Sequence, residues 1–191
     1  MITSDMEIRL ATERDVEGIL AIYAPYIEHS WTSFEETVPD HTSMWNRIAD
    51  ILQESPWLVL TSGGVVAGYA YANNHRWRAA YIWAKEVSVY VHPDFRNRGV
   101  AHKLYAALFN ILKVQGVKHV LAGVALPNEA SVNFHLKQGF SIVGTYRGIG
   151  YKFGTWHDIS WYQMTIAEGN PDKRPVLLSD MTDEQVAAAL L

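Results

Sequence analysis

The sequence predicts one domain of the mixed α/β class, with helices packed on a central sheet. Three observations predict this class. Residues 86–116 read as a strand, a glycine-containing turn and a helix in immediate succession. Residues 57–61 and 65–72 are apolar and flank Ser62-Gly63-Gly64, which is a strong hairpin signal. Along the whole chain, the periodic segments follow the order β-α-α-β-β-β-α-β-α-β-β.

The first quarter of the chain is expected to contain one strand and two helices. Residues 7–11 alternate polar and apolar side chains as a strand does, and Thr12 is a suitable N-cap for the helix that follows. Residues 29–39 show no clear periodicity. A second helix is expected at residues 40–53, before the hairpin.

The strand, turn and helix at residues 86–116 carry the clearest chemical signal. Valine alternates with serine and tyrosine over residues 87–91, and apolar residues recur at helical spacing over 100–112. Gly116 stands where a helix end favours a left-handed residue. A helix N-terminus has free N–H groups and about half a positive charge. The junction at residues 96–99, with one glycine and two arginines, is therefore suited to hold a phosphate or pyrophosphate.

The remaining body of the chain is expected to add a helix and three strands. Residues 118–126 read as a buried strand, and Asn128 is a good N-cap for a helix that ends at Gly139. The last two strands and the turn between them are expected at residues 140–146, 159–166 and 152–158.

The composition changes after residue 166. Residues 167–191 begin as a linker rich in proline and glycine and end in a short apolar helix that starts near Thr182. A helix of this length is marginal alone, so we expect it to dock on the body or on a neighbouring subunit.

Length and composition bound the possible functions. The 191 residues are 49% hydrophobic and 19% charged, as in an ordinary globular domain. A net charge of −4 gives no support for broad binding to nucleic acid or to a membrane surface. The chain has no cysteine, which excludes a cysteine acyl carrier, and its eight histidines show no paired metal spacing, so no metal is expected. The sequence shows no targeting or membrane-spanning segment, which predicts a cytoplasmic location.

Residues 96–101, RNRGVA, resemble the R-x-x-G-x-G/A pyrophosphate loop of the GCN5-related N-acetyltransferases. Residues 126–140, which contain LPN and HLKQGF, resemble the second cofactor segment of that superfamily. Residues 75–83 and 150–158 resemble one branch of it, the phosphinothricin and methionine sulfone or sulfoximine acetyltransferases. The match covers about residues 6–166, and residues 1–166 are expected to form the acetyltransferase domain, followed by the linker and short helix at 167–191.

The resemblance implies a mixed central sheet with a splayed strand pair, helices on both faces, and acetyl-CoA bound in the gap between the splayed strands. In such a gap the main chain of the strand at 86–91 binds the pantetheine arm and polarises the thioester carbonyl. For Asn128 and Ser131, helix capping is the alternative role. The implied cofactor-binding residues are Val89, Tyr90, Val91, Arg96, Asn97, Arg98, Gly99, Val100, Ala101, Asn128 and Ser131.

Two residues match catalytic positions of the branch. Glu86 is implied as the general base, directly or through a water, and its alternative role is a solvated charge on a strand. His135 stands where many members have a tyrosine that protonates the leaving thiolate. An imidazole has a pKa of about 6.5 and would need an upward shift to stay charged. The alternative for His135 is a hydrogen-bonded bystander.

The resemblance also implies an acceptor site. Arg76 or Arg78 would pair with an acidic group of the acceptor in fork geometry, whereas the alternative is a solvated arginine pair. Lys152, Trp156 and Asp158 either shape the acceptor pocket or support its wall. The implied substrate-binding residues are Phe34, Arg76, Trp77, Arg78, Tyr81, Glu86, Val87 and Ser88.

These residues predict an N-acetyltransferase that moves acetyl from acetyl-CoA directly to the α-amino group of a small amino acid. Phosphinothricin, methionine sulfone and methionine sulfoximine are the acceptors that the resemblance implies, and a homodimer is expected. Two alternatives remain: a protein or peptide N-acetyltransferase, and an acetyl-CoA-binding regulatory module without turnover. Aromatic residues at 31–34 and 77–83 favour an enclosed site and so a small acceptor, although Trp31 and Phe34 have a second interpretation, closure of the core.

Overall fold

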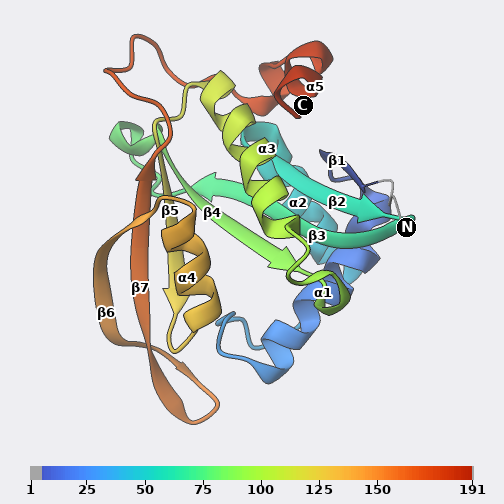
Figure 1. Ribbon diagram of the computed structural model, residues 1–191, viewed down its shortest axis with the longest axis vertical. Helices are drawn as coiled ribbons and strands as arrows, with labels where there is room; N and C mark the ends of the chain where they lie inside the picture. The colour runs from blue at the N-terminus through green and yellow to red at the C-terminus, as the bar shows by residue number, and fades with distance from the viewer. Residues whose placement is uncertain (1–5, 191) are drawn as a thin grey trace.

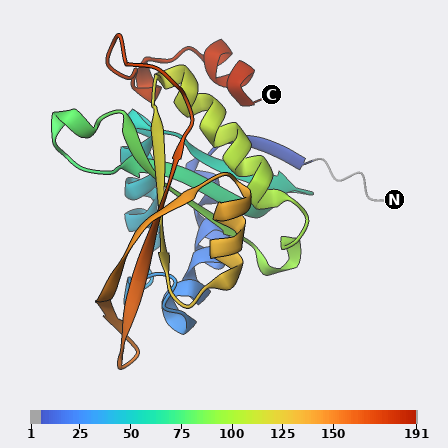
Figure 2. The ribbon, with the colours of Figure 1, turned by 60° about the vertical axis from the view of Figure 1, so that its left-hand side comes forward.

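The computed structural model describes residues 6–190, which form a seven-stranded sheet with helices on both faces (Figures 1 and 2). The strand order is β1-β2-β3-β4-β5-β7-β6. All neighbouring pairs are antiparallel except β4 and β5, so the sheet is mixed, as predicted. The strands are β1 (Met6–Leu10), β2 (Trp57–Ser62), β3 (Val65–Asn74), β4 (Ala84–Val91), β5 (His119–Ala125), β6 (Ser141–Lys152) and β7 (Thr155–Thr165).

Capping side chains and glycines with left-handed backbone conformations set where the helices begin and end. The carboxylate of Asp40 accepts a hydrogen bond from the Ser43 amide at 2.7 Å and caps α2. Gly99 and Gly116 flank α3 and both have left-handed backbone conformations, with φ of 78° and 95°. The helices are α1 (Val16–His29), α2 (His41–Glu54), α3 (Val100–Gln115), α4 (Glu129–Lys137) and α5 (Asp183–Leu190).

The sheet separates two apolar cores. Alternation along β2 shows this directly, because Leu58 and Leu60 pack toward α3 while Trp57 and Val59 pack toward α1 and α2. All four side chains are buried, so β2 is a central strand with both faces covered. The functional site is therefore confined to places where this layered packing is interrupted.

Such an interruption lies between β4 and β5. Within the described chain the two strands pair only over Ala84–Glu86 and His119–Leu121. Beyond Glu86 the strands diverge, as Figure 1 shows. This is the splayed pair that the sequence predicts, and a cleft opens between its two strands.

The last two strands are longer than the sequence predicts. Strands β6 and β7 continue through the expected turn at 152–158 and are joined only by Phe153 and Gly154. These two residues have φ of 52° and 75°, the left-handed pair that a tight hairpin requires. A register shift between Tyr146 and Gly150 interrupts the alternation of β6, which hid its full length.

The C-terminal helix docks on the body, as predicted. Helix α5 packs beside α3, with Ala189 buried and Val186 and Leu190 against the same core (Figure 1). Leu191 lies outside the described residues. Gln115 at the end of α3 also ties down the preceding tail, because its amide donates at 2.8 Å to the carbonyl oxygen of Val176. No helix within residues 6–190 is long and apolar enough to cross a membrane.

Candidate active site

A cleft of ≈ 470 Å³ lies between the diverging strands and is called the β4–β5 cleft below. Its walls are β4, β5, the end of α1, the start of α4 and one side of α3. Several residues implied by the sequence line it: Val87, Ser88, Val89, Tyr90, Arg96, Asn128, Ser131 and His135. Others lie beside it, at the end of β4 or at the start of α3: Val91, Asn97, Arg98, Gly99, Val100 and Ala101.

The start of α3 has the geometry of an anion site. Asn97 and Gly99 both have positive φ, 59° and 78°, so the loop curls ahead of the helix. A Cβ added to Gly99 would meet no atom within 4 Å, and the space before the helix N-terminus is open. Val100 is buried in the core, so only its main chain is available to a ligand. These features fit the pyrophosphate of acetyl-CoA, which free helix N–H groups can bind.

Glu86 is the last residue of β4 that pairs with β5 before these two strands diverge. Its carboxylate Oε1 lies 2.8 Å from Nδ1 of His75, and Nη1 of Arg76 lies 3.8 Å away. The Glu86 side chain is 35% exposed, and Glu86 lies next to the lining residue Val87 without lining the β4–β5 cleft itself. Glu86 is thus not a free surface charge, because an imidazole engages it directly. The sequence does not predict a role for His75, because its contact with Glu86 depends on the sheet register that pairs Asn73 with Glu86.

The β3–β4 loop, residues 75–83, does not enclose the site in the predicted way. Trp77 is 88% exposed, and the Arg78 guanidinium stacks over its ring at 5.6 Å. Tyr81 is also partly exposed. The expectation that this aromatic loop closes over the acceptor is therefore not met at Trp77, which lines a separate pocket with Ile82 and Leu177 and not the β4–β5 cleft. Of the two arginines, it is Arg76 that faces Glu86.

Lys152 stabilises the segment that follows α1. Its side chain is 5% exposed, and Nζ donates to the carbonyl oxygens of Ile27, Ser30 and Ser33 at 2.6, 2.9 and 2.7 Å. All three ammonium protons are used, and the acceptors surround the C-terminal end of α1. Burial lowers the pKa of Lys152, although nearby Glu36 and Glu35 act in the opposite direction. The sequence leaves two roles open for Lys152, and these contacts favour the second, in which Lys152 supports the wall of the acceptor pocket rather than shaping its surface.

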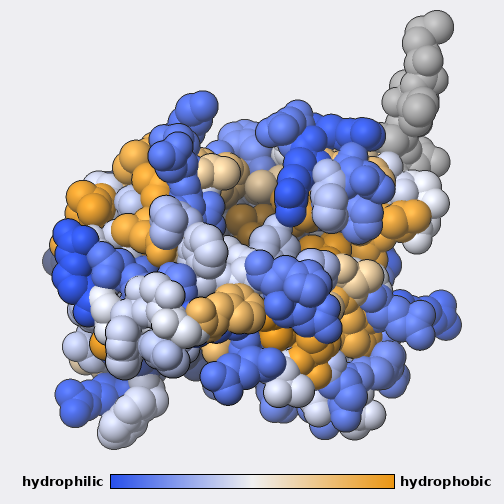
Figure 3. Space-filling view, turned by 90° about the horizontal axis from the view of Figure 1, so that it is seen from below, coloured by the Kyte–Doolittle hydropathy of each residue, from blue (hydrophilic) through white to orange (hydrophobic). Residues whose placement is uncertain are grey.

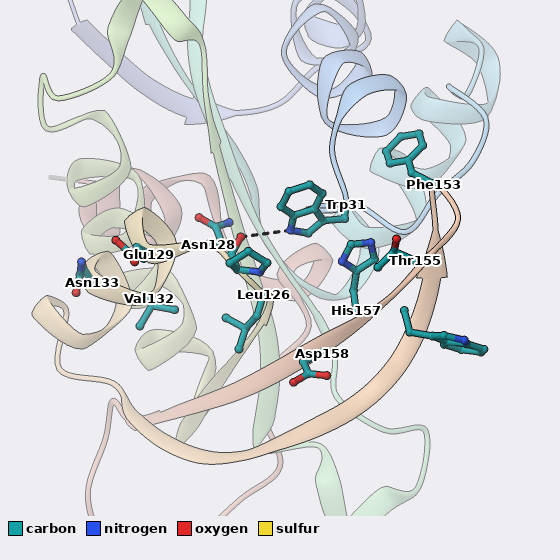
Figure 4. A pocket seen from close by; sticks show the side chains of 12 residues that line it. Trp31, Leu126, Asn128, Glu129, Val132, Asn133, Phe153, Thr155, His157 and Asp158 are labelled. Carbon is teal, nitrogen blue, oxygen red and sulfur yellow. Dashed lines mark hydrogen bonds between the residues drawn. The ribbon is translucent and has the colours of Figure 1, made fainter.

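Aromatic packing joins the same segment to the β6–β7 hairpin. The Trp31 ring stacks on His157 with 5.2 Å between centroids, and Phe34 lies against Gly150 (Figure 4 shows Trp31 beside His157). A Cβ at Gly150 would come within 2.3 Å of the Phe34 ring. Trp31 also donates from Nε1 to the Pro127 carbonyl at 3.3 Å and lines the β4–β5 cleft. Phe34 does not line this cleft, so its implied contact with the substrate is not seen here.

A second polar contact holds the far side of this segment. Arg47 of α2 binds the Glu35 carboxylate in a bidentate pair at 2.7 and 3.2 Å. The Tyr23 hydroxyl donates to Glu35 at 3.0 Å, and burial raises the pKa of Tyr23 to about 12. Neither residue was singled out from the sequence, because nothing in the local pattern links α1 and α2 to residue 35.

His135 is buried and hydrogen-bonded on both ring nitrogens. Its Nδ1 lies 2.8 Å from the Ser131 carbonyl oxygen, so Nδ1 carries a proton. Its Nε2 lies 3.1 Å from the Tyr105 hydroxyl, which donates to it when the ring is neutral. Burial lowers the pKa of His135, and the bond to Ser131 opposes that shift only in part. The upward shift that an acid role requires is therefore not found. The sequence does not predict Tyr105 as a site residue, because it lies among the apolar residues of α3.

A larger hollow of ≈ 910 Å³ adjoins the β4–β5 cleft and shares Trp31, Pro127 and Asn128 with it. Figure 4 shows this hollow between the start of α4 and the β6–β7 hairpin. The side chain of Asn128 accepts a hydrogen bond from the Ser131 amide at 3.2 Å, so the capping role proposed for Asn128 is present. Asp158 anchors the irregular part of β6, because it accepts from Arg147 and from the Gly148 amide at 2.7 and 2.8 Å.

Comparison with known proteins agrees with this geometry. The model of the Acetyltransferase (GNAT) domain family matches residues 8–161. A phosphinothricin N-acetyltransferase of Streptomyces viridochromogenes is 39% identical, over 90% of this chain and 94% of that protein. An L-methionine sulfoximine/L-methionine sulfone acetyltransferase of Pseudomonas aeruginosa is 34% identical, over 83% and 94%.

Among solved structures, a phosphinothricin acetyltransferase from Sinorhizobium meliloti, in complex with AcCoA, superposes with a TM-score of 0.81. It is 29% identical and the match covers 90% of this chain and 93% of that one. The matched range contains both the α3 N-terminus and the β4–β5 cleft. This chain therefore belongs to the GNAT family of acetyltransferases.

Proposed function

We propose that this chain transfers acetyl from acetyl-CoA directly to the α-amino group of a small amino acid, of the kind represented by phosphinothricin, methionine sulfone and methionine sulfoximine. The observation that carries the proposal is the position of Glu86, a carboxylate at the point where β4 and β5 diverge into a cleft. The names of the relatives give the acceptor class.

The cofactor side of the proposal uses main-chain groups and the start of α3. Residues 96–101 bind the pyrophosphate, with Gly99 leaving open space for it. The edge of β4 beyond Glu86 has no ladder partner on β5 within the described chain, so its N–H and C=O groups are available to a pantetheine arm. One such N–H, from Val89 or Val91, polarises the thioester carbonyl.

The chemical step needs a base for the amine and a proton for the leaving sulfur. Glu86 takes the amine proton. His135 would have to be charged to supply a proton, and its lowered pKa leaves it mostly neutral at neutral pH. We therefore assign His135 to the wall of the cleft, where its Nε2 accepts a hydrogen bond from the Tyr105 hydroxyl. Only the small charged fraction of His135 can return a proton to the leaving sulfur.

Arg76 is the basic residue we assign to the acceptor, since it lies 3.8 Å from Glu86 and is about half exposed. A planar guanidinium there can pair with the carboxylate or the oxyanionic side chain of an amino acid. Arg78, Trp77, Tyr81 and Phe34 keep their implied substrate roles as predictions only. A peptide acceptor is the second candidate, and the exposure of Trp77 is the observation that favours it.

We also propose that the enzyme is a homodimer, as expected from the resemblance, and that it works in the cytoplasm. Strand β6 is last in the sheet order, and apolar side chains along it and at the hairpin are more than half exposed. They are Ile142, Val143, Tyr146, Ile149, Tyr151, Phe153 and Trp156. Figure 3 looks onto the end of the molecule that includes the hairpin tip and shows apolar groups gathered around a hollow.

Light scattering tests the dimer. We expect twice the chain mass for the wild type and a monomer for Ile142→Lys, because a buried charge disfavours the interface. Val65→Lys is the matched control, since Val65 is 51% exposed at the other side of the sheet and should leave the mass unchanged. A wild-type monomer at high concentration would contradict this part of the proposal.

A thiol-release assay tests the activity. Acetyl-CoA is offered with free amino acids, phosphinothricin, methionine sulfone, methionine sulfoximine and short peptides. We expect turnover with the small acceptors and a loss of about 100-fold or more in Glu86→Gln, in line with general-base catalysis. Glu184→Gln, on the exposed side of α5, is the control and should keep full activity. Turnover with peptides alone would replace the proposed acceptor class.

A further inference from the structure

We infer that His75 is a positioning residue that holds the Glu86 carboxylate in place for proton transfer. The inference rests on the proposed function, in which Glu86 is the base. Its structural basis is the 2.8 Å contact between His75 Nδ1 and Glu86 Oε1. Among residues 6–190, no other group makes a hydrogen bond to this carboxylate, and Arg76 approaches it only to 3.8 Å.

The contact fixes which atoms are donor and acceptor. An ionised carboxylate only accepts hydrogen bonds, so Nδ1 of His75 must carry the proton. Oε1 of Glu86 is then occupied by the imidazole. The second oxygen, Oε2, is left with its lone pairs to receive the amine proton, either directly or through a water. A carboxylate with one oxygen fixed has less freedom to rotate away from the amine.

The imidazole is itself held on two sides. Its ring meets Tyr81 and Trp161 edge to face, with centroid distances of 5.9 and 6.0 Å. The His75 side chain is 16% exposed, less than half the exposure of Glu86. Trp161 in turn packs over Gly123 of β5, where an added Cβ would lie 3.3 Å from the ring. His75 is thus a fixed support rather than a mobile loop side chain.

His75 also positions the nearest competing charge, which is the guanidinium of Arg76. Arg76 donates from Nη1 to the His75 carbonyl oxygen at 3.0 Å, which directs its guanidinium. The charged and titratable groups facing the imidazole are therefore Glu86, Arg76 and Tyr81. Lys85 lies on the opposite face of β4, bonded to Asn74 at 2.7 Å. Without the imidazole, Arg76 becomes the natural partner for the Glu86 carboxylate, and its ion pair competes with the amine for that carboxylate.

Two substitutions separate the hydrogen bond from the ring. Asparagine places an amide N–H close to the position of Nδ1, whereas leucine has similar bulk and no donor. We expect His75→Leu to lower kcat by about 10- to 100-fold, the range for a hydrogen bond to a charged catalytic group, with KM for acetyl-CoA nearly unchanged. His75→Asn should recover most of the lost kcat. His41→Leu, at the exposed start of α2, is the matched control.

A double variant tests whether His75 acts through Glu86. If it does, His75→Leu combined with Glu86→Gln is no slower than Glu86→Gln alone. If the effects of the two substitutions on kcat multiply, or if folded His75→Leu keeps the wild-type kcat, the inference is overturned and the base assignment stays intact. Full activity of Glu86→Gln would instead remove the base assignment itself. Circular dichroism and melting temperature confirm that each variant is folded.

Discussion

Lys152 offers the sharpest test of how the site is assembled. Lys152→Met keeps the length of the side chain and removes every donor. The carbonyl oxygens of Ile27, Ser30 and Ser33 then lose a shared partner, all three at 2.9 Å or less in the wild type. The segment after α1 carries Trp31, which lines the β4–β5 cleft, so loosening it should reach the acceptor side of the site.

The size of the effect follows from the contacts. A hydrogen bond to a charged group contributes about 1.5–3 kcal/mol, so three give roughly 5–9 kcal/mol before any cost is counted. Burying the ammonium costs several kcal/mol, roughly 3–5, and methionine removes this cost together with the bonds. The expected loss in the free energy of unfolding is about 2–4 kcal/mol.

Urea unfolding, monitored by tryptophan fluorescence, measures this loss, and hydrogen exchange locates it. We expect faster exchange at residues 27–34 and a higher KM for the amino acid, with KM for acetyl-CoA little changed. Lys152→Arg should recover less than half of the stability, because a planar fork cannot direct donors to three separate carbonyls. Lys137→Met, exposed on α4, is the control. A change below about 0.5 kcal/mol, with an unaltered acceptor KM, would refute the reasoning, since surface substitutions alone stay within that range.

Three further predictions concern other contacts. Gly150→Ala places a methyl group against the Phe34 ring, and we expect a loss of about 1–3 kcal/mol in urea unfolding and a raised acceptor KM; unaltered stability would show that Phe34 moves freely. Burial alone would raise the pKa of Asp15, but hydrogen bonds from Arg9 and from its own helix cap outweigh it and leave the pKa lowered. Asp15→Asn should therefore lower the free energy of unfolding by about 2–3 kcal/mol at pH 7. This difference from the wild type should shrink as the pH falls below the ordinary carboxyl pKa and through the lowered pKa of Asp15. A difference that persists at low pH would contradict this. His135→Gln should reduce kcat at neutral pH by less than about tenfold, whereas a general acid would cost 100-fold or more.

The cofactor side of the molecule could be predicted from the sequence because its signals are local. The alternation over 87–91, the glycines at 99 and 116 and the apolar spacing of α3 all lie within one continuous segment. Each of these signals acts through neighbours in the chain, so the structure differs from the prediction by only a residue or two. The two-residue turn of the β2–β3 hairpin was predictable for the same reason.

The acceptor side could not be predicted in the same way. Whether Lys152 shapes a pocket or supports a wall depends on carbonyl groups more than 100 residues earlier in the chain. The charge state of His135 depends on its burial beside Tyr105, and the orientation of Trp77 depends on what the loop meets. The full length of β6 was hidden by its irregular register at residues 147–149.

Changes in acceptor preference depend on long-range contacts of this kind. In the proposed function the acceptor side combines residues 30–35, 75–86 and 150–158, and the first and last of these segments meet through long-range contacts, Lys152 to Ser33 and Trp31 to His157. The proposed pyrophosphate site, by contrast, lies within one continuous strand, turn and helix. A substitution in any of the three segments can therefore shift the acceptor pocket while the anion site at α3 stays intact. Acceptor specificity can vary on this fold because the anion site at α3 does not depend on these contacts.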